Sequence, residues 1–210
     1  MHEQFWHDRW EQNQLGFHEA EFNSFLVRHF QELSLKKNAR VFVPLCGKTL
    51  DMHWLLSNGY KVAGAELSEI AIIQLFEELD VKPTIQEIGD LKHYQSPNID
   101  IFVGDIFALN PDLLGHVDAI FDRGAFVALP DAMRLKYSKH LIEITKTAPQ
   151  LLVTFEYDQN VVQGPPFAIS KEEVEKHYAD AHTLSKLPER VLEDGFRGAK
   201  PAAECGWILS

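Results

Sequence analysis

Residues 40–49 read RVFVPLCGKT, a short β-rich run that ends at Pro44 and is followed by a turn containing Gly47. Four further β-rich runs follow it, at 61–66, 99–103, 117–122 and 150–155. Helical segments separate them, around 51–57, 68–79 and 131–147. Strands that alternate with helices in this way are typical of a parallel sheet with helices on both faces. The sequence therefore predicts an α/β fold with a doubly wound, mostly parallel sheet.

The end of the chain extends this prediction. Gly164-Pro165-Pro166-Phe167 is expected to be a stiff loop without helix, because proline fixes φ and also restricts the residue before it. Ser170 is expected to cap a helix at 171–181. Weak strands at 183–187 and 205–209 bring the predicted sheet to seven strands.

The start of the chain is rich in aromatic residues. Apolar residues at three- and four-residue spacings predict one amphipathic helix, formed by Phe22, Phe25, Leu26, His29, Phe30 and Leu33. A loop or short helix before it contains Trp6, Trp10, Gly16 and Phe17. We expect one domain over 1–210, in which an aromatic-rich helical extension (1–38) precedes the core (39–210).

The composition indicates an ordinary soluble protein, with 45% hydrophobic and 24% charged residues. Twenty Lys and Arg oppose 31 Asp and Glu, and the net charge of −11 repels phosphate backbones and anionic membranes. We expect no nucleic-acid partner and no membrane partner. Cys46 and Cys205 lack metal-ligand spacing, so we expect no metal and no disulfide. With no recognisable signal peptide or spanning segment, and no apolar surface helix face, the expectation is a cytoplasmic monomer.

Candidate site residues follow the predicted strands at the point where each strand ends. Gly47 follows the first strand, Glu66 ends the second, Ile106 follows the third and Arg123 follows the fourth. In open α/β sheets, ligands bind beyond the carboxyl ends of the strands. Glycine permits a close backbone approach, a carboxylate can accept hydrogen bonds from ribose hydroxyls, and an apolar slot suits adenine. The positions together predict a nucleoside site.

Each of these features also has an ordinary structural explanation. Gly47 could belong to a plain turn, and Glu66 could simply be solvated. Asp105 could cap the turn that follows it instead of contacting adenine. Arg123 could form a surface ion pair with Asp122, which contributes about 0–1 kcal/mol.

Other nucleotide sites are excluded by the same residues. Gly47-Lys48-Thr49 resembles the end of a phosphate-binding loop, but Phe42 stands where that loop needs its first glycine. Pro44 also removes one amide donor. The chain lacks both the three spaced glycines of a dinucleotide site and a Gly-x-Ser-x-Gly hydrolase motif. A sulfonium cofactor has no need of a phosphate cradle, and aromatic faces, which Trp6 and Trp10 could supply, favour its positive charge.

Several motifs carry a family resemblance between Trp6 and Phe167. They are Trp6-His7-Asp8-Arg9-Trp10, Gly16-Phe17-His18, Val41-Phe42-Val43-Pro44-Leu45-Cys46-Gly47-Lys48, Gly64-Ala65-Glu66-Leu67-Ser68, Asp122-Arg123-Gly124-Ala125 and Gly164-Pro165-Pro166-Phe167. In these motifs the chain resembles the thiopurine S-methyltransferases, which have the class I, Rossmann-like methyltransferase fold. Pro-Leu-Cys-Gly-Lys after a strand is highly specific to this group.

The resemblance implies a set of ligand contacts. S-adenosylmethionine would be the cofactor and S-adenosylhomocysteine the product, with no metal. The cofactor would be contacted by Trp10, Leu45, Gly47, Glu66, Ile106 and Arg123. The acceptor would be contacted by Phe17, Pro166, Phe167 and an arginine late in the chain. Arg197 is the candidate for that arginine, and Arg190 is its rival.

The implied reaction is direct transfer of a methyl group to the thiolate of an aromatic or heterocyclic thiol. The thiolate is the reactive form, so no strong general base is required. Arg123 and Arg197 would act in catalysis by stabilising the anionic acceptor, while Asp8 is a proton acceptor or a helix cap. The alternatives are another soft acceptor, such as halide, thiocyanate or an oxyanion of selenium or tellurium, and a non-catalytic module that only binds S-adenosylmethionine.

Overall fold

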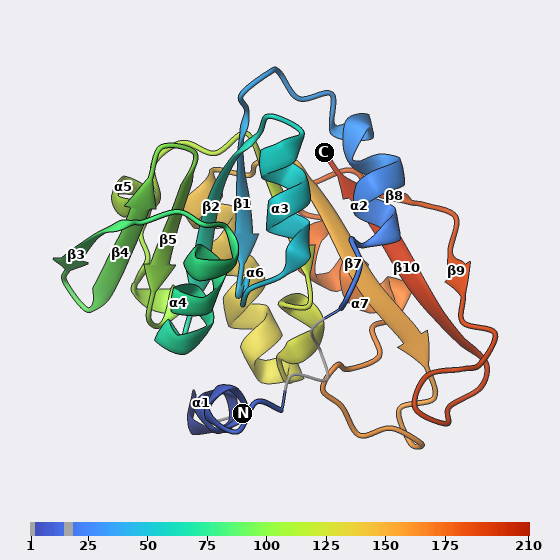
Figure 1. Cartoon of the computed structure of the whole chain (residues 1–210). Helices are drawn as coiled ribbons and strands as arrows, with labels where there is room; N and C mark the ends of the chain where they lie inside the picture. The colour runs from blue at the N-terminus through green and yellow to red at the C-terminus, as the bar shows by residue number, and fades with distance from the viewer. Residues whose placement is uncertain (1–2, 15–18) are drawn as a thin grey trace.

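The computed structural model describes residues 3–14 and 19–210, and within them ten strands form one sheet (Figure 1). The strand order is β3-β4-β5-β2-β1-β6-β7-β10-β8, with β9 beside β10. The strands are β1 (Arg40–Pro44), β2 (Lys61–Glu66), β3 (Thr84–Ile88), β4 (Leu91–Ser96), β5 (Ile99–Val103), β6 (Ala119–Arg123), β7 (Gln150–Tyr157), β8 (Leu184–Lys186), β9 (Arg190–Val191) and β10 (Ala202–Leu209).

Helices fill the connections between the strands and precede the first of them. They are α1 (Glu3–Glu11), α2 (Ser24–His29), α3 (Leu50–Ser57), α4 (Glu69–Glu78), α5 (Pro111–Leu114), α6 (Asp131–Thr145) and α7 (Lys171–Tyr178), with short 3₁₀ turns η1 (Phe30–Leu33), η2 (Ile106–Ala108) and η3 (Phe126–Ala128). The Ser170 hydroxyl accepts from the Glu173 N–H and caps α7, as predicted. No helix in the described part of the chain is both long and apolar enough to cross a membrane.

The two faces of the sheet carry separate hydrophobic clusters. Phe42 of β1 packs with Tyr137 of α6 and Tyr178 of α7 in one cluster. Its neighbours Val41 and Val43 point to the opposite face and join the cluster that contains side chains of α2, α3 and α4. Because successive side chains of a strand alternate between faces, one strand supplies both cores. This arrangement confirms the doubly wound fold.

The five central strands are parallel, and their neighbours on both sides are antiparallel. β5, β2, β1, β6 and β7 run parallel, whereas β4 opposes β5 and β10 opposes β7. The prediction of seven strands was too low, because it missed the β3–β4 hairpin and the two-residue β9. Four of the five β3 side chains are exposed, so this strand lacks the apolar pattern from which a strand is recognised.

The amphipathic helix predicted near the N-terminus is shorter than the apolar spacing suggested. Phe22 lies before it and is 45% exposed, and Asn23 caps α2 by accepting from the Phe25 and Leu26 N–H groups. The pattern then continues through the 3₁₀ turn η1. Phe25, Leu26 and Phe30 are buried, so the apolar spacing did identify the core-facing side.

The strand order reverses between β1 and β6. From β1 the chain proceeds to β2 and β5 on one side, whereas β6 and β7 lie on the other. Ligands of such sheets bind at this reversal, beyond the carboxyl ends of the strands. Figure 1 shows α1 lying beyond that edge of the sheet, below the point of the β1 arrow.

Candidate active site

The turn after β1 presents its backbone to a cavity at the strand reversal. Leu45 and Gly47 both have positive φ, +44° and +51°, and the Cys46 N–H donates to the Ala65 carbonyl at 3.0 Å. A Cβ at Gly47 would lie 3.2 Å from Cζ2 of Trp10 on α1, which is tighter than ordinary packing. The residue at position 47 must therefore be small and must tolerate a left-handed backbone.

Glu66 at the end of β2 holds this turn. Its side chain is buried, with 7% of its surface exposed. Oε2 accepts from the Gly47 N–H and Oε1 from the Ser68 N–H, both at 2.8 Å. Burial raises the pKa of the Glu66 carboxyl, and the backbone N–H groups of Ser68, Gly47 and Leu67 oppose that rise. A carboxylate offers about four acceptor positions. The carboxylate therefore keeps acceptor capacity for a ligand.

The turn after β5 provides an apolar wall. Asp105 accepts from the Phe107 N–H at 3.0 Å and so caps η2, which is the ordinary alternative foreseen for this residue. The carbonyl of Ile106 accepts from Nε2 of His140 on α6 at 2.8 Å. The ring of Phe107 lies 3.6 Å from the Lys136 ammonium. Asp105, Ile106 and Phe107 all line the cavity.

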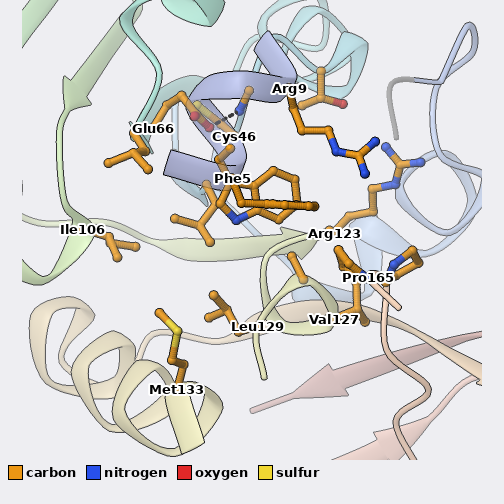
Figure 2. Close-up of a pocket in the computed structure, with 18 of the residues that line it drawn as sticks. Phe5, Arg9, Cys46, Glu66, Ile106, Arg123, Val127, Leu129, Met133 and Pro165 are labelled. Carbon is orange, nitrogen blue, oxygen red and sulfur yellow. Dashed lines mark hydrogen bonds between the residues drawn. The ribbon is translucent and has the colours of Figure 1, made fainter. Parts of the chain in front are cut away.

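Arg123 ends β6 with its side chain 12% exposed. Its guanidinium lies 3.2 Å from Oε1 of Glu19. The alternative of an ion pair with Asp122 is wrong, because the Asp122 carboxylate is fully buried and accepts from the Tyr137 hydroxyl at 2.7 Å. Figure 2 shows the guanidinium groups of Arg9 and Arg123 on the same side of the cavity.

The loop after β7 and the segment before β10 close the same side. Arg197 donates to the Pro165 carbonyl at 3.0 Å, and Phe196 stacks on Phe155 with ring centroids 5.2 Å apart. The rival Arg190 is not a lining residue; its guanidinium lies 2.7 Å from Glu204.

The cavity measures about 560 Å³, within the range of roughly 300–1,000 Å³ found for small-molecule sites. Eight of the residues proposed from the sequence line it: Trp10, Leu45, Gly47, Glu66, Ile106, Arg123, Pro166 and Arg197. Phe167 is not among the described lining residues; its ring lies 5.7 Å from the Arg134 guanidinium. Phe17 lies outside the described residues.

Comparison with known proteins identifies the family. The family model of thiopurine S-methyltransferase (TPMT) matches residues 1–202. The chain belongs to this family. It is 50% identical over 210 residues to a thiopurine S-methyltransferase of Xanthobacter autotrophicus, covering 100% of this chain and 99% of that protein. It is 48% identical over 210 residues to one of Teredinibacter turnerae, covering 100% and 98%. As a member, it is an S-adenosylmethionine-dependent methyltransferase.

Solved structures agree on the fold. The 1,6-didemethyltoxoflavin-N1-methyltransferase of Burkholderia thailandensis, solved with S-adenosylhomocysteine, is similar with a TM-score of 0.68 and 12% identity, covering 99% of this chain and 86% of that one. A TehB-like methyltransferase of Corynebacterium glutamicum is similar with a TM-score of 0.59 and 12% identity, covering 100% and 97%. At these identities the likeness shows the class I methyltransferase fold alone.

A buried carboxylate behind Arg123 organises the cavity wall of this methyltransferase. Asp122 accepts from the Phe126 N–H at 3.1 Å and thereby ties the end of β6 to η3. Val127 and Ala128 of η3 line the cavity. Burial raises the pKa of Asp122 to about 6, although the bonds from Tyr137 and Phe126 oppose that rise. Asp122 therefore shapes the site without facing it.

Two groups of potential metal ligands occur among the described residues, and both lie off the cavity. Asp131, Glu173 and His177 form one group, and Glu156, Glu189 and Cys205 form the other. Arg134 is ion-paired with Glu173, and the Lys186 ammonium lies 3.0 Å from Glu156. These cations already neutralise the carboxylates that a metal would need.

Some lining residues were missed by the sequence reasoning. Phe5 and Arg9 of α1, Glu19, and Ala132, Met133 and Lys136 of α6 belong to this set. The α6 residues occupy one helical face, so their spacing carried a signal. Nothing in the local sequence distinguishes Glu19. Asp8, considered as a proton acceptor or a cap, lies inside α1 and accepts from Gln4 at 2.7 Å.

Proposed function

We propose that this methyltransferase transfers the methyl group of S-adenosylmethionine to the thiolate of an aromatic or heterocyclic thiol, such as a thiopurine. The observation that carries the proposal is a single cavity with a carboxylate at one end and arginines at the other. Figure 2 shows Glu66 and Ile106 on one side and Arg9, Arg123 and Pro165 on the other. The names of the relatives in Xanthobacter and Teredinibacter support the same acceptor class.

The carboxylate end suits the nucleoside part of the cofactor. Beyond its bonds from the Gly47 and Ser68 N–H groups, the Glu66 carboxylate keeps acceptor capacity for the ribose hydroxyls. Ile106 supplies an apolar surface for adenine, and the turn at Leu45 and Gly47 lets a ligand approach the backbone. When bound, S-adenosylmethionine supplies an electrophilic methyl group on a positively charged sulfur.

Aromatic side chains suit that positive charge. Phe5, Trp6 and Trp10 of α1 line the cavity, and Trp10 packs over the Gly47 turn. Cations are attracted to aromatic faces by about 0.5–2 kcal/mol. We propose that Trp10 contacts the cofactor and that α1 keeps water from this end of the cavity.

The arginine end suits an anionic ring. Arg123 and Arg197 would hold the thiolate, with Phe155, Phe196 and Pro166 as apolar walls. These residues would act by orienting the acceptor sulfur. Correct orientation of two reacting groups can correspond to an effective concentration of about 10⁵ M or more. A small-molecule acceptor fits a cavity of about 560 Å³.

The test is methyl transfer from labelled S-adenosylmethionine, with cofactor binding titrated alongside. Thiophenol and 6-mercaptopurine should be methylated, and iodide, thiocyanate, selenite and tellurite serve as the competing soft acceptors. Faster transfer to one of these anions than to either thiol would contradict the proposed acceptor class. Tight cofactor binding without transfer to any acceptor would instead indicate a binding module.

A further inference from the structure

Two carboxylates interact with Arg123, and they differ in exposure. Asp51 of α3 is buried, with 1% of its surface exposed, and accepts from the Asn23 N–H at 2.7 Å. The charge of Arg123 opposes the rise that burial causes in the pKa of Asp51, so the two groups interact. Glu19 is 65% exposed and lies 3.2 Å from the guanidinium. Asp51 is a fixed counter-charge, whereas Glu19 lies on the cavity side.

Within the described part of the chain, Arg123 is the main partner of the Glu19 carboxylate. Arg123 is its one ion-pair partner among the described residues, and no hydrogen bond of its carboxylate occurs among them. Glu19 also lines the cavity. Its carboxylate therefore occupies the side of Arg123 that an anionic ligand of the cavity would need.

We propose that Glu19 is an exchangeable counter-ion for Arg123, displaced by an anionic methyl acceptor and restored when the acceptor becomes neutral. The inference rests on the proposed function for the identity of the acceptor.

The chemistry of the acceptor supplies a reason for the return of Glu19. A lone pair of the thiolate sulfur forms the new bond to the methyl carbon, and the electron pair of the broken carbon–sulfur bond stays with the donor sulfur. The anionic thiolate thereby becomes a neutral thioether that no longer competes for Arg123. Glu19 can then pair with Arg123 again.

The test compares Glu19→Gln with Glu21→Gln, a matched control that removes the same charge two residues away. Glu21 is exposed and does not line this cavity. Benzoate and its neutral counterpart benzamide are titrated by calorimetry into protein loaded with S-adenosylhomocysteine, and the KM for thiophenol is measured in parallel. Thermal unfolding of each variant confirms that it is folded.

We expect Glu19→Gln to lower both the Kd for benzoate and the KM for thiophenol by about two- to fivefold. This is the range that the energy of a partly exposed ion pair supports. Benzamide should bind the same in all proteins, and Glu21→Gln should match the wild type. Weaker benzoate binding in Glu19→Gln, equal effects of the two variants, equal tightening of benzamide, or no benzoate binding at all would overturn the counter-ion role. Failure of the wild type to methylate thiophenol would count against the proposed acceptor only, because the benzoate comparison needs no turnover.

Discussion

Replacing Glu66 by glutamine tests the carboxylate end of the cavity. The carboxylate accepts two backbone N–H bonds at 2.8 Å and keeps further acceptor capacity for a ligand. Glutamine keeps one oxygen, and its NH₂ group would face one of those backbone donors. At least one ribose hydroxyl then loses its acceptor. Hydrogen bonds to charged groups contribute about 1.5–3 kcal/mol, so the Kd for S-adenosylhomocysteine should rise by about tenfold to a hundredfold.

The assay must separate loss of a ligand contact from damage to the Gly47 turn. We would titrate wild type and Glu66→Gln by calorimetry with S-adenosylhomocysteine and with its 2′-deoxy analogue. The four binding free energies form a thermodynamic cycle analogous to a double-mutant cycle. If Glu66 accepts from the 2′-hydroxyl, the variant should lose much less affinity for the deoxy analogue. Glu77→Gln, an exposed substitution on α4, controls for the change in charge. Equal losses for both ligands, within about 0.5 kcal/mol, would show that Glu66 makes no bond to the 2′-hydroxyl.

Three further predictions concern the turn, the buried carboxylate and the late arginine. Gly47→Ala places a Cβ 3.2 Å from Trp10 on a backbone with φ +51°. The substitution should lower the free energy of unfolding by about 1 kcal/mol, and calorimetry should show weaker binding of S-adenosylhomocysteine. The pKa of Asp122 is raised from 3.8 to about 6, so the folded state favours the protonated carboxyl. Its contribution to the free energy of unfolding, roughly 3 kcal/mol, is complete below pH 4 and is lost as the pH rises through 6. Denaturant unfolding between pH 4 and 7 should show that Asp122→Asn lacks this slope, and parallel curves for the two proteins would contradict it. Arg197→Gln should raise the KM for thiophenol with little change in the free energy of unfolding. Arg190→Gln should mainly destabilise the protein, because the buried Glu204 carboxylate loses its cationic partner and keeps only the hydrogen bond from Asn23.

The central strands could be predicted because burial on both faces gives them continuous apolar runs. Strand β1 contributes to both hydrophobic clusters, through Phe42 on one face and Val41 and Val43 on the other. The turn residues that follow mark where the strand ends. The β3–β4 hairpin gives no such signal, because its outer strand is solvated and is held by its pairing with β4. The Gly89-Asp90 turn between the two strands was the available clue, since such pairs favour two-residue hairpins.

Some residues of the candidate site could also be predicted from the sequence, and others could not. Gly47, Glu66, Ile106 and Arg123 follow four strands whose carboxyl ends meet, so topology alone brings them together. Trp10 was placed only by its family motif, because the position of α1 depends on tertiary contacts made far along the chain. The ion pair with Asp122 that was considered as an alternative for Arg123 does not form, since alternation along β6 turns the Asp122 side chain into the core.

Several ionisable groups in and behind the cavity wall are consistent with the proposed thiol acceptor. No histidine occurs among the described lining residues. Burial, reinforced by Glu66, raises the pKa of the Cys46 thiol well above its ordinary value, so this thiol stays protonated. The Glu66 carboxylate is engaged by two N–H groups and Asp122 faces the core, which leaves neither placed to take a proton from an acceptor. An acceptor that arrives already ionised needs no such base, and the arginines at the other end of the cavity then favour its reactive form over the neutral thiol.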